Sequence, residues 1–200
     1  MRTAKRIDEL PPYLFASLDR KIEEARSRGI DVISLAIGDP DLPTPLHIVE
    51  AAVEGLRDPA THRYPNYYGM AEFRQAIAGY YQRRFGVTLD PDSQVLPLIG
   101  SKEGIAHLPI AFVDPGDGVL VSDPGYPVYE AAGMLMGGKT VPVALDPDAG
   151  WAPNLAAVAD EEVANSKLLW LNYPNNPTAA TCDLSLLEGA VRFSKTHDLL

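Results

Sequence analysis

The sequence contains a single cysteine, Cys182, among its 200 residues. An internal disulfide therefore cannot form, and a reducing cytoplasm is the expected setting. The chain also lacks an apolar run long enough to span a bilayer, and its early basic residues, Arg2, Lys5 and Arg6, precede acids rather than an apolar core. We therefore expect no secretory signal and no membrane-spanning segment.

Positive charge is scarce, with 17 Lys and Arg residues against 27 Asp and Glu residues, a net charge of -10 and a pI near 4.8. No basic stripe is present, so nucleic acid and anionic membranes are not expected partners. The four histidines lie far apart, without metal-ligand spacing, and we expect none to bind a metal. The glycine-rich fingerprints of nicotinamide and nucleoside-triphosphate sites, G-x-G-x-x-G and G-x-x-x-x-G-K-[ST], are absent.

Hydrophobic residues make up 46% of the chain, which is enough for a sizeable core. Apolar periodicity predicts helices over residues 12–28, 45–56, 70–85, 100–112, 126–136 and from 184 onward. Short β-type runs predict strands over residues 32–37, 95–99, 119–121, 140–145 and 168–171. The alternation of strand and helix in the second half predicts parallel pairing with right-handed crossovers. The expected fold class is α/β.

Two helix starts carry clear capping signals. Thr44 is the expected N-cap of one helix, with Pro45 at its first position, and Asp183 is the expected N-cap of another. The helix after Asp183 is expected to turn four apolar side chains inward: Leu184, Leu187, Val191 and Phe193. A further buried strand should begin at residues 199–200, so we expect the chain to be the N-terminal part of a longer protein.

The most informative segment is LNYPNNPT at residues 171–178, where an apolar strand stops at a turn rich in proline and asparagine. Its prolines fix φ, so the turn is stiff and its amides are held in place. Polar groups that follow a strand lie at the carboxyl edge of an α/β sheet, where ligands bind. An ordinary loop is the alternative interpretation of this segment alone.

Two other junctions fit the same edge. Gly100, Ser101 and Lys102 open a helix, where free N–H groups, a hydroxyl and an ammonium group would bind a phosphate. The alternative is an ordinary serine N-cap with a nearby acid. Tyr126 follows the next strand on the turn DPGYP (residues 123–127) and would lie against a planar heteroaromatic ring. Plain packing is the alternative for this tyrosine.

Two loops nearer the N-terminus are further candidates. Tyr64 begins the tyrosine-dense loop YPNYYG (residues 64–69), which suits anion contact or a subunit interface. Gly38 lacks a Cβ and would let a ligand carboxylate approach the backbone, although a simple turn is the default interpretation. The expected anion site at residues 100–102, the Tyr126 ring and the amide donor Asn176 together fit a phosphorylated aromatic cofactor with a ring hydroxyl.

Taken together, these motifs resemble those of the class I/II, fold-type I, pyridoxal-phosphate-dependent aminotransferases. The resemblance rests on the order and spacing of the Gly38-x-Pro40 turn and of the segments at residues 64–69, 100–104, 123–127 and 175–178. Within that group, SKEGIAH (residues 101–107) and NYPNNPT (residues 172–178) are most similar to the LL-diaminopimelate aminotransferases.

The resemblance implies a role for each motif residue. Gly100, Ser101 and Lys102 would hold the phosphate of pyridoxal 5′-phosphate, Tyr126 would stack on its pyridine ring and Asn176 would bind its ring hydroxyl. Tyr64 would reach the phosphate of the partner in a homodimer, and Gly38 would meet the substrate carboxylate.

The resemblance also implies a three-layer α/β/α fold with a mostly parallel sheet, truncated on its C-terminal side, behind an N-terminal helical arm. Residues 1–45 would form the arm and part of the small domain, and residues 46–200 part of the large cofactor-binding domain. The family's Schiff-base lysine would lie beyond Leu200, so the chain holds no catalytic residue and is expected to be inactive alone. Lys102 suits phosphate better than imine chemistry.

The expected activity of the complete protein is transfer of an amino group from an amino acid to a 2-oxo acid in amino acid biosynthesis, with LL-diaminopimelate and 2-oxoglutarate as candidate substrates. A β-lyase, a decarboxylase or a non-catalytic homologue are the alternatives. One position departs from the family, which has glycine where Ala179 stands. If that position needs φ > 0, alanine costs about 1 kcal/mol there.

Overall fold

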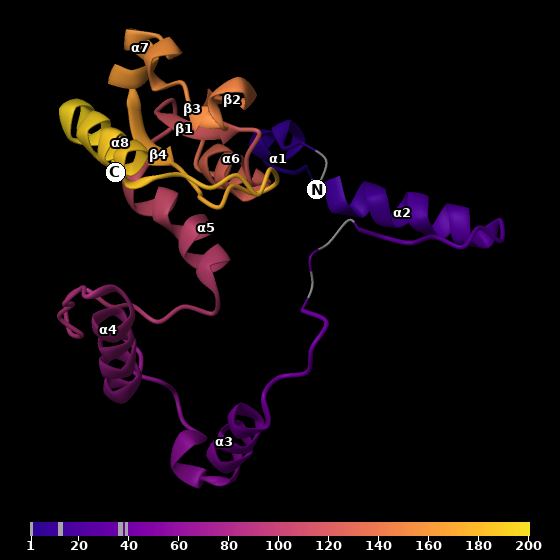
Figure 1. Ribbon diagram of the computed structural model, residues 1–200, viewed down its shortest axis with the longest axis vertical. Helices are drawn as coiled ribbons and strands as arrows, with labels where there is room; N and C mark the ends of the chain where they lie inside the picture. The colour runs from indigo at the N-terminus through magenta and orange to yellow at the C-terminus, as the bar shows by residue number, and fades with distance from the viewer. Residues whose placement is uncertain (1, 12–13, 36–37, 39) are drawn as a thin grey trace. The chain divides into compact units, whose positions relative to one another are not determined.

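The computed structural model describes residues 2–11, 14–35, 38 and 40–200 (Figure 1). Its contacts divide the chain into two units, Met1–Pro11 with Leu98–Leu200, and Pro12–Pro97. Each unit is described by itself below. The domain division expected at residue 45 stays a prediction.

The first unit is the α/β part of the chain. Its helices are α1 (Lys5–Glu9), α5 (Ser101–Phe112), α6 (Pro127–Leu135), η2 (Pro147–Ala149), η3 (Leu155–Ala157), α7 (Asp160–Ala164) and α8 (Leu184–His197). Its strands are β1 (Gly118–Asp123), β2 (Lys139–Asp146), β3 (Ala152–Pro153) and β4 (Ser166–Trp170). The helices and strands expected from residue 100 onward are therefore confirmed to within a few residues.

The sheet has the strand order β3-β2-β1-β4. The central strand β1 pairs in parallel with β2 and with β4, whereas the short β3 pairs antiparallel with β2. The parallel pairing expected from the sequence is confirmed. Beyond β4, the amide of Leu200 donates to the carbonyl of Lys167 at 3.0 Å, and the amide of Leu169 donates to the carbonyl of Leu200 at 2.8 Å. Leu200 thus pairs with β4 on the edge away from β1.

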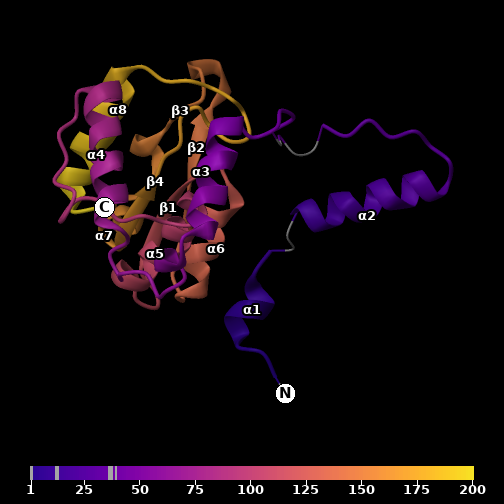
Figure 2. The ribbon, with the colours of Figure 1, turned by 90° about the horizontal axis from the view of Figure 1, so that it is seen from below.

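Alternation along β1 builds a core on each face of the sheet. Val119 and Val121 pack with α5 and α6, while Leu120, fully buried, points to the face that carries α8. Figure 2 shows α8 and α6 on opposite sides of the strands. Since successive strand residues point to opposite faces, one apolar run serves both cores. The result is the expected three-layer α/β/α arrangement.

The second unit contains α2 (Leu14–Ser27), α3 (Leu46–Arg57), η1 (Pro59–Thr61) and α4 (Ala71–Phe85). Gly86 ends α4 in the left-handed region at φ 69°, as a helix C-terminus commonly requires. The expected N-cap of α3 is wrong by one residue: Pro45 occupies the cap and helix geometry begins at Leu46, without a side-chain cap bond from Thr44.

Two predicted strands are wrong. Residues 95–99 are irregular: Pro97 cannot donate to a ladder, and none of the strands in the described part of the chain pairs with them. Residues 32–35 are also irregular, and Ala36 and Ile37 of that prediction lie outside the described residues.

The expected inward face of α8 is only partly right. Phe193 packs on the core beside Leu120, but Leu184, Leu187 and Val191 are exposed in this unit. The apolar pattern predicts the residue range of the helix correctly, but it does not predict which of its apolar side chains are buried here. No helix of the described residues has the length and apolar character that a membrane crossing needs.

The Asp183 cap gives a pH-dependent prediction. The Asp183 carboxylate accepts from the Leu186 amide at 3.0 Å and from the Ser185 hydroxyl at 2.8 Å, and these bonds lower its pKa below the usual 3.8. A lowered pKa means that the cap stabilises fully above pH 3.8 and is lost as the pH falls through the folded-state pKa. We therefore expect Asp183→Ala to lower the melting temperature near neutral pH and to converge with the wild type in acid.

The neutral cap Asp183→Asn is the matched control, because asparagine caps helices as well as aspartate does. It should equal the wild type near neutral pH and exceed it in acid. Melting curves followed by circular dichroism across that range test this. A constant gap between Asp183→Ala and the wild type at every pH would contradict it.

Candidate functional site

The carboxyl ends of β1 and β4 meet at one edge of the sheet. The Ser122 hydroxyl on β1 donates to the carbonyl of Trp170 on β4 at 3.2 Å. Gly125 follows β1 with its backbone against the Ser122 carbonyl, where a Cβ would collide. The loop after β1 can therefore turn tightly at this point and bring Tyr126 to the start of α6.

Tyr126 is held by a chain of aromatic rings. Its ring packs edge-on against Tyr129, with centroids 5.6 Å apart at 84°, and Tyr129 stacks on Trp170 at 5.1 Å and 9°. Burial, followed by the neighbouring Tyr126, raises the pKa of the Tyr129 phenol above its usual value of 10.0. Tyr129 therefore stays neutral at physiological pH and forms a fixed support for the half-buried Tyr126 ring.

The turn at residues 171–178 is tied to the loop after β1 by Asn175. This residue is 3% exposed, and its amide group donates to the Pro124 carbonyl at 3.3 Å and to the Thr178 hydroxyl at 3.0 Å. The next residue, Asn176, is exposed. The buried amide thus fixes the backbone from which the Asn176 side chain extends.

Ala179 adopts φ 59°, the left-handed conformation for which glycine is favoured. The turn around it is closed by two backbone bonds, from Ala179 to the Asn175 carbonyl at 2.7 Å and from Asn175 to the Ala180 carbonyl at 2.8 Å. The position therefore does need φ > 0, where the resemblance implies glycine, and Ala179 carries a strain of about 1 kcal/mol there.

The N-terminus of α5 has the features of an anion site. Gly100 occupies the cap at φ 89° without a side-chain cap bond, so the alternative of a serine N-cap at residue 101 is wrong. Glu103 instead accepts from the Ile99 amide at 2.7 Å, ahead of the first helical turn. N–H groups of a first turn have no partner within their helix and favour negative charge. Ser101 and Lys102 are exposed beside them.

The same core links α5 to Tyr126. Ile105, one helical turn after Ser101, packs against the buried cluster that Tyr126 also contacts. The shared core therefore packs α5 against the segment that carries Tyr126, and Asn175 ties the Asn176 turn to the loop just before Tyr126.

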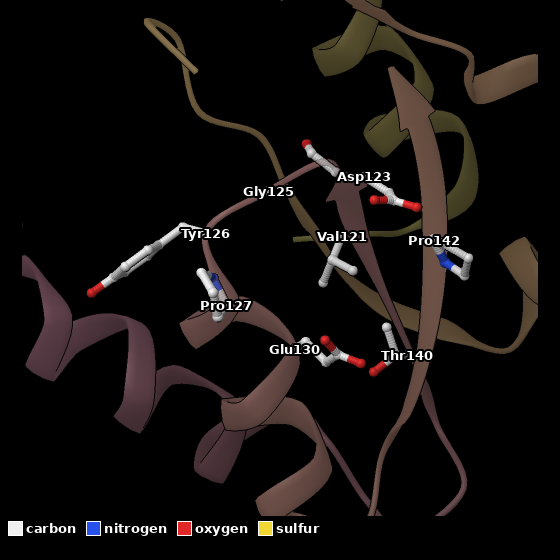
Figure 3. Close-up of a pocket in the computed structure, with 9 residues that line it drawn as sticks. Val121, Asp123, Gly125, Tyr126, Pro127, Glu130, Thr140 and Pro142 are labelled. Carbon is white, nitrogen blue, oxygen red and sulfur yellow. The ribbon is translucent and has the colours of Figure 1, made fainter. Parts of the chain in front are cut away.

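A cavity of about 440 Å³ adjoins this edge (Figure 3). Its lining includes the polar side chains of Asp123, Glu130 and Thr140, and the Tyr126 ring extends away from these three side chains. Of the predicted site residues, only Tyr126 lines it. The cavity therefore lies beside the predicted anion and ring contacts rather than between them.

The remaining predicted residues, Gly38 and Tyr64, belong to the second unit. Gly38 is exposed, and a Cβ there would meet no atom within 4 Å, so the need for glycine does not arise from its own unit. The Tyr64 residue is 99% exposed. Their roles stay predictions.

Sequence reasoning missed the residues that hold the site together. Asn175 and Asn176 have the same side chain, so the sequence does not show which of them is buried. The Tyr129–Trp170 stack has no local signal because its rings come from different elements. Among the described residues, no group of three or more His, Cys, Asp or Glu side chains is placed to hold a metal.

Comparisons with known proteins identify the family. The family profile described as aminotransferase class I and II matches residues 30–200. LL-diaminopimelate aminotransferase of Moorella thermoacetica is 50% identical over 200 residues, which cover 100% of this chain and 51% of that protein. The enzyme of the same name from Desulforudis audaxviator is 53% identical over 197 residues, covering 98% and 50%. The chain thus spans about half the length of these curated relatives.

Solved structures give the same result. Substrate-bound BacF from Bacillus subtilis superimposes with a TM-score of 0.93 at 34% identity, covering 100% of this chain and 51% of that one. The probable N-succinyldiaminopimelate aminotransferase of Thermus thermophilus gives 0.86 at 37% identity, covering 94% and 50%.

The buried amide of Asn175 yields a stability prediction. In the complete, cofactor-free protein, Asn175→Ala should lower the free energy of unfolding by about 1–3 kcal/mol, because the Pro124 carbonyl loses its donor. The exposed neighbour serves as the control, and Asn176→Ala should change it by no more than about 0.5 kcal/mol. Denaturant unfolding curves measure both, and equal effects of the two variants would contradict the assignment.

Proposed function

Because the chain belongs to the class I and II aminotransferase family, we propose that the complete protein transfers an amino group from an amino acid to a 2-oxo acid. The structural observation that supports this most directly is the bond from Asn175 to the Pro124 carbonyl, which joins the Tyr126 and Asn176 loops within the segment that matches the family. Pyridoxal 5′-phosphate is the cofactor of this family.

The described residues fit that cofactor group by group. Its phosphate suits the first turn of α5, where no side chain caps the helix and Ser101 and Lys102 add a hydroxyl and an ammonium group. Its planar pyridine ring suits Tyr126, which Tyr129 holds at 84°. Its ring hydroxyl suits the exposed amide of Asn176 beside the buried Asn175.

When bound, the cofactor supplies a ring that stabilises negative charge at the substrate Cα. The chain's own residues bind and orient it. The α5 N-terminus and Ser101 hold the anionic group, Tyr126 fixes the plane of the ring, and Asn176 donates a hydrogen bond to the ring oxygen. Gly38 would admit the substrate carboxylate to the backbone.

The proposed amino donor is LL-diaminopimelate and the proposed acceptor is 2-oxoglutarate. Two relatives at 50% and 53% identity carry the name LL-diaminopimelate aminotransferase, and a solved structure at 37% carries the name of an N-succinyldiaminopimelate aminotransferase. This substrate class also fits a role in amino acid biosynthesis. The single cysteine, which allows no internal disulfide, favours a cytoplasmic enzyme. The exposed Tyr64 loop favours a homodimer.

The substrate proposal is tested by assaying the complete protein with four amino donors: LL-diaminopimelate, aspartate, alanine and glutamate. We expect kcat/KM to be highest for LL-diaminopimelate, with glutamate formed from 2-oxoglutarate in equal amount. Residues 1–200 alone should show no turnover, because the lysine expected beyond Leu200 is missing. Pyruvate and ammonia, or carbon dioxide, as products would instead indicate a lyase or a decarboxylase.

The proposed dimer makes a separate prediction about cofactor binding. Ser101→Ala and Tyr64→Phe should each weaken cofactor affinity about 10- to 100-fold, the effect of removing one hydrogen bond to a charged group. If Tyr64 acts across the interface, a heterodimer of the two variants contains one site with both changes and one with neither.

A cofactor titration of that heterodimer, followed by the absorbance of bound cofactor, should therefore show half of the sites with wild-type affinity. Homodimers of either variant are the controls and should show none. If the heterodimer also has no wild-type site, Tyr64 does not act across an interface.

A further inference from the structure

Arg74 is the one charged residue among the described residues that is buried, at 9% exposed. It lies in the first turn of α4. A guanidinium removed from water destabilises a fold unless its N–H groups find acceptors. Its partners therefore indicate what the residue does.

The Arg74 guanidinium bonds to two segments, one just before α4 and one after it. Its Nη1 donates to the carbonyls of Tyr68 at 3.2 Å and Gly69 at 2.6 Å, at the end of the tyrosine loop. Its Nε donates to the Pro91 carbonyl at 2.9 Å, and its Nη2 to Asp92 Oδ1 at 2.8 Å. The planar fork of arginine meets these directions together, whereas a lysine ammonium is a single point charge.

The carbonyl bonds, rather than the ion pair, give this contact its strength. The Asp92 side chain is 79% exposed, so water and salt screen its charge. The backbone that carries Pro91 and Asp92 is fixed independently. The Gln94 amide donates to the Asp90 carbonyl, and the Asp90 amide donates to the Gln94 side chain, each at 2.9 Å. Arg74 thus fastens the tyrosine loop to a rigid turn.

The loop itself is closed at the end that Arg74 holds. The Gly69 amide donates to the Asn66 carbonyl at 2.8 Å, and the Tyr68 amide donates to the Asn66 side chain at 2.9 Å. Gly69 has φ 76°, and a Cβ there would lie 2.7 Å from Pro97. Tyr64 and Tyr67, in contrast, are 99% and 100% exposed. Within this unit, the position of Tyr64 is therefore set by the backbone of its loop, one end of which Arg74 holds, and not by burial of its ring.

We infer that Arg74 is a positioning residue for Tyr64: it fixes the stem of the loop at residues 64–69 and so sets where the Tyr64 hydroxyl meets the cofactor phosphate. This inference rests on the role of Tyr64 in the proposed function. Arg74 itself touches neither cofactor nor substrate in this account. Its effect on the cofactor passes through Tyr64 alone.

A double-mutant cycle on cofactor affinity in the complete protein tests this. Arg74→Lys keeps the charge but cannot reach all three carbonyls, and we expect it to raise the cofactor Kd about fivefold, against about tenfold for Tyr64→Phe. The double variant should match Tyr64→Phe within about twofold, because residues that act through one contact are not additive. Arg83→Lys, an exposed arginine of the same helix, is the control and should leave the Kd unchanged.

Hydrogen–deuterium exchange gives a readout that needs no cofactor. In the cofactor-free protein, Arg74→Lys should speed exchange of the amides at residues 68–69, while amides of α8 in the other unit keep their wild-type rates. Asp92→Asn should alter neither exchange nor affinity appreciably, since it leaves the carbonyl bonds in place. If Arg74→Lys does not fold, Gly69→Ala disturbs the same stem against Pro97 and should show the same lack of additivity with Tyr64→Phe.

The outcomes separate the two claims. An unchanged Kd in Tyr64→Phe alone would show that the proposed role of Tyr64 is wrong, and the inference about Arg74 would fall with it. If Tyr64→Phe raises the cofactor Kd and Arg74→Lys leaves it unchanged, the inference is overturned and the proposed function still holds. Multiplying effects in the double variant would also overturn it, because Arg74 would then act by another route.

Discussion

The parallel pairing of β1 with both of its neighbours is the constraint on which the rest of the site depends. Since all three strands run the same way, the segments that follow β1 and β4 must emerge at one edge of the sheet. Ser122 and Asn175 then lock those segments together through the carbonyls of Trp170 and Pro124. The chemistry proposed for Tyr126 and Asn176 needs their spacing to hold without a ligand, and these two bonds supply that rigidity.

A second level of organisation lies in the side chains that support the contact groups. Tyr129 and Trp170 hold the Tyr126 ring from behind, and Asn175 holds the backbone of Asn176. Arg74 has the corresponding place in the second unit, where it secures a loop whose tip is almost wholly exposed. In each case a more buried group with hydrogen bonds or ring contacts fixes a more exposed one, which is the arrangement expected of a preorganised binding site.

The sequence was sufficient for the elements whose signals are local. The Asp183 cap, Gly86 at the end of α4 and the alternating segments from Ser101 to Trp170 could all be predicted, because capping, left-handed glycine and strand–helix alternation depend on neighbouring residues. The strand expected at residues 95–99 failed because pairing depends on a partner strand that no local pattern reveals. For the same reason the roles of Arg74 and Asn175 could not be predicted, since each has an acceptor far along the chain, 17 positions away for Arg74 and 51 for Asn175. Turn chemistry was enough to predict the candidate contact residues, whereas the side chains that hold them in place could not be predicted from it.

The central claim is that the α5 N-terminus, Tyr126 and Asn176 form one binding surface for pyridoxal 5′-phosphate. A crystal structure of the complete protein with this cofactor tests it most directly. The account predicts the phosphate within hydrogen-bonding distance of the Ser101 hydroxyl and the first amides of α5, the pyridine ring against Tyr126, and the ring oxygen bonded to the Asn176 amide. Density for the cofactor elsewhere, or with its phosphate away from α5, would contradict it.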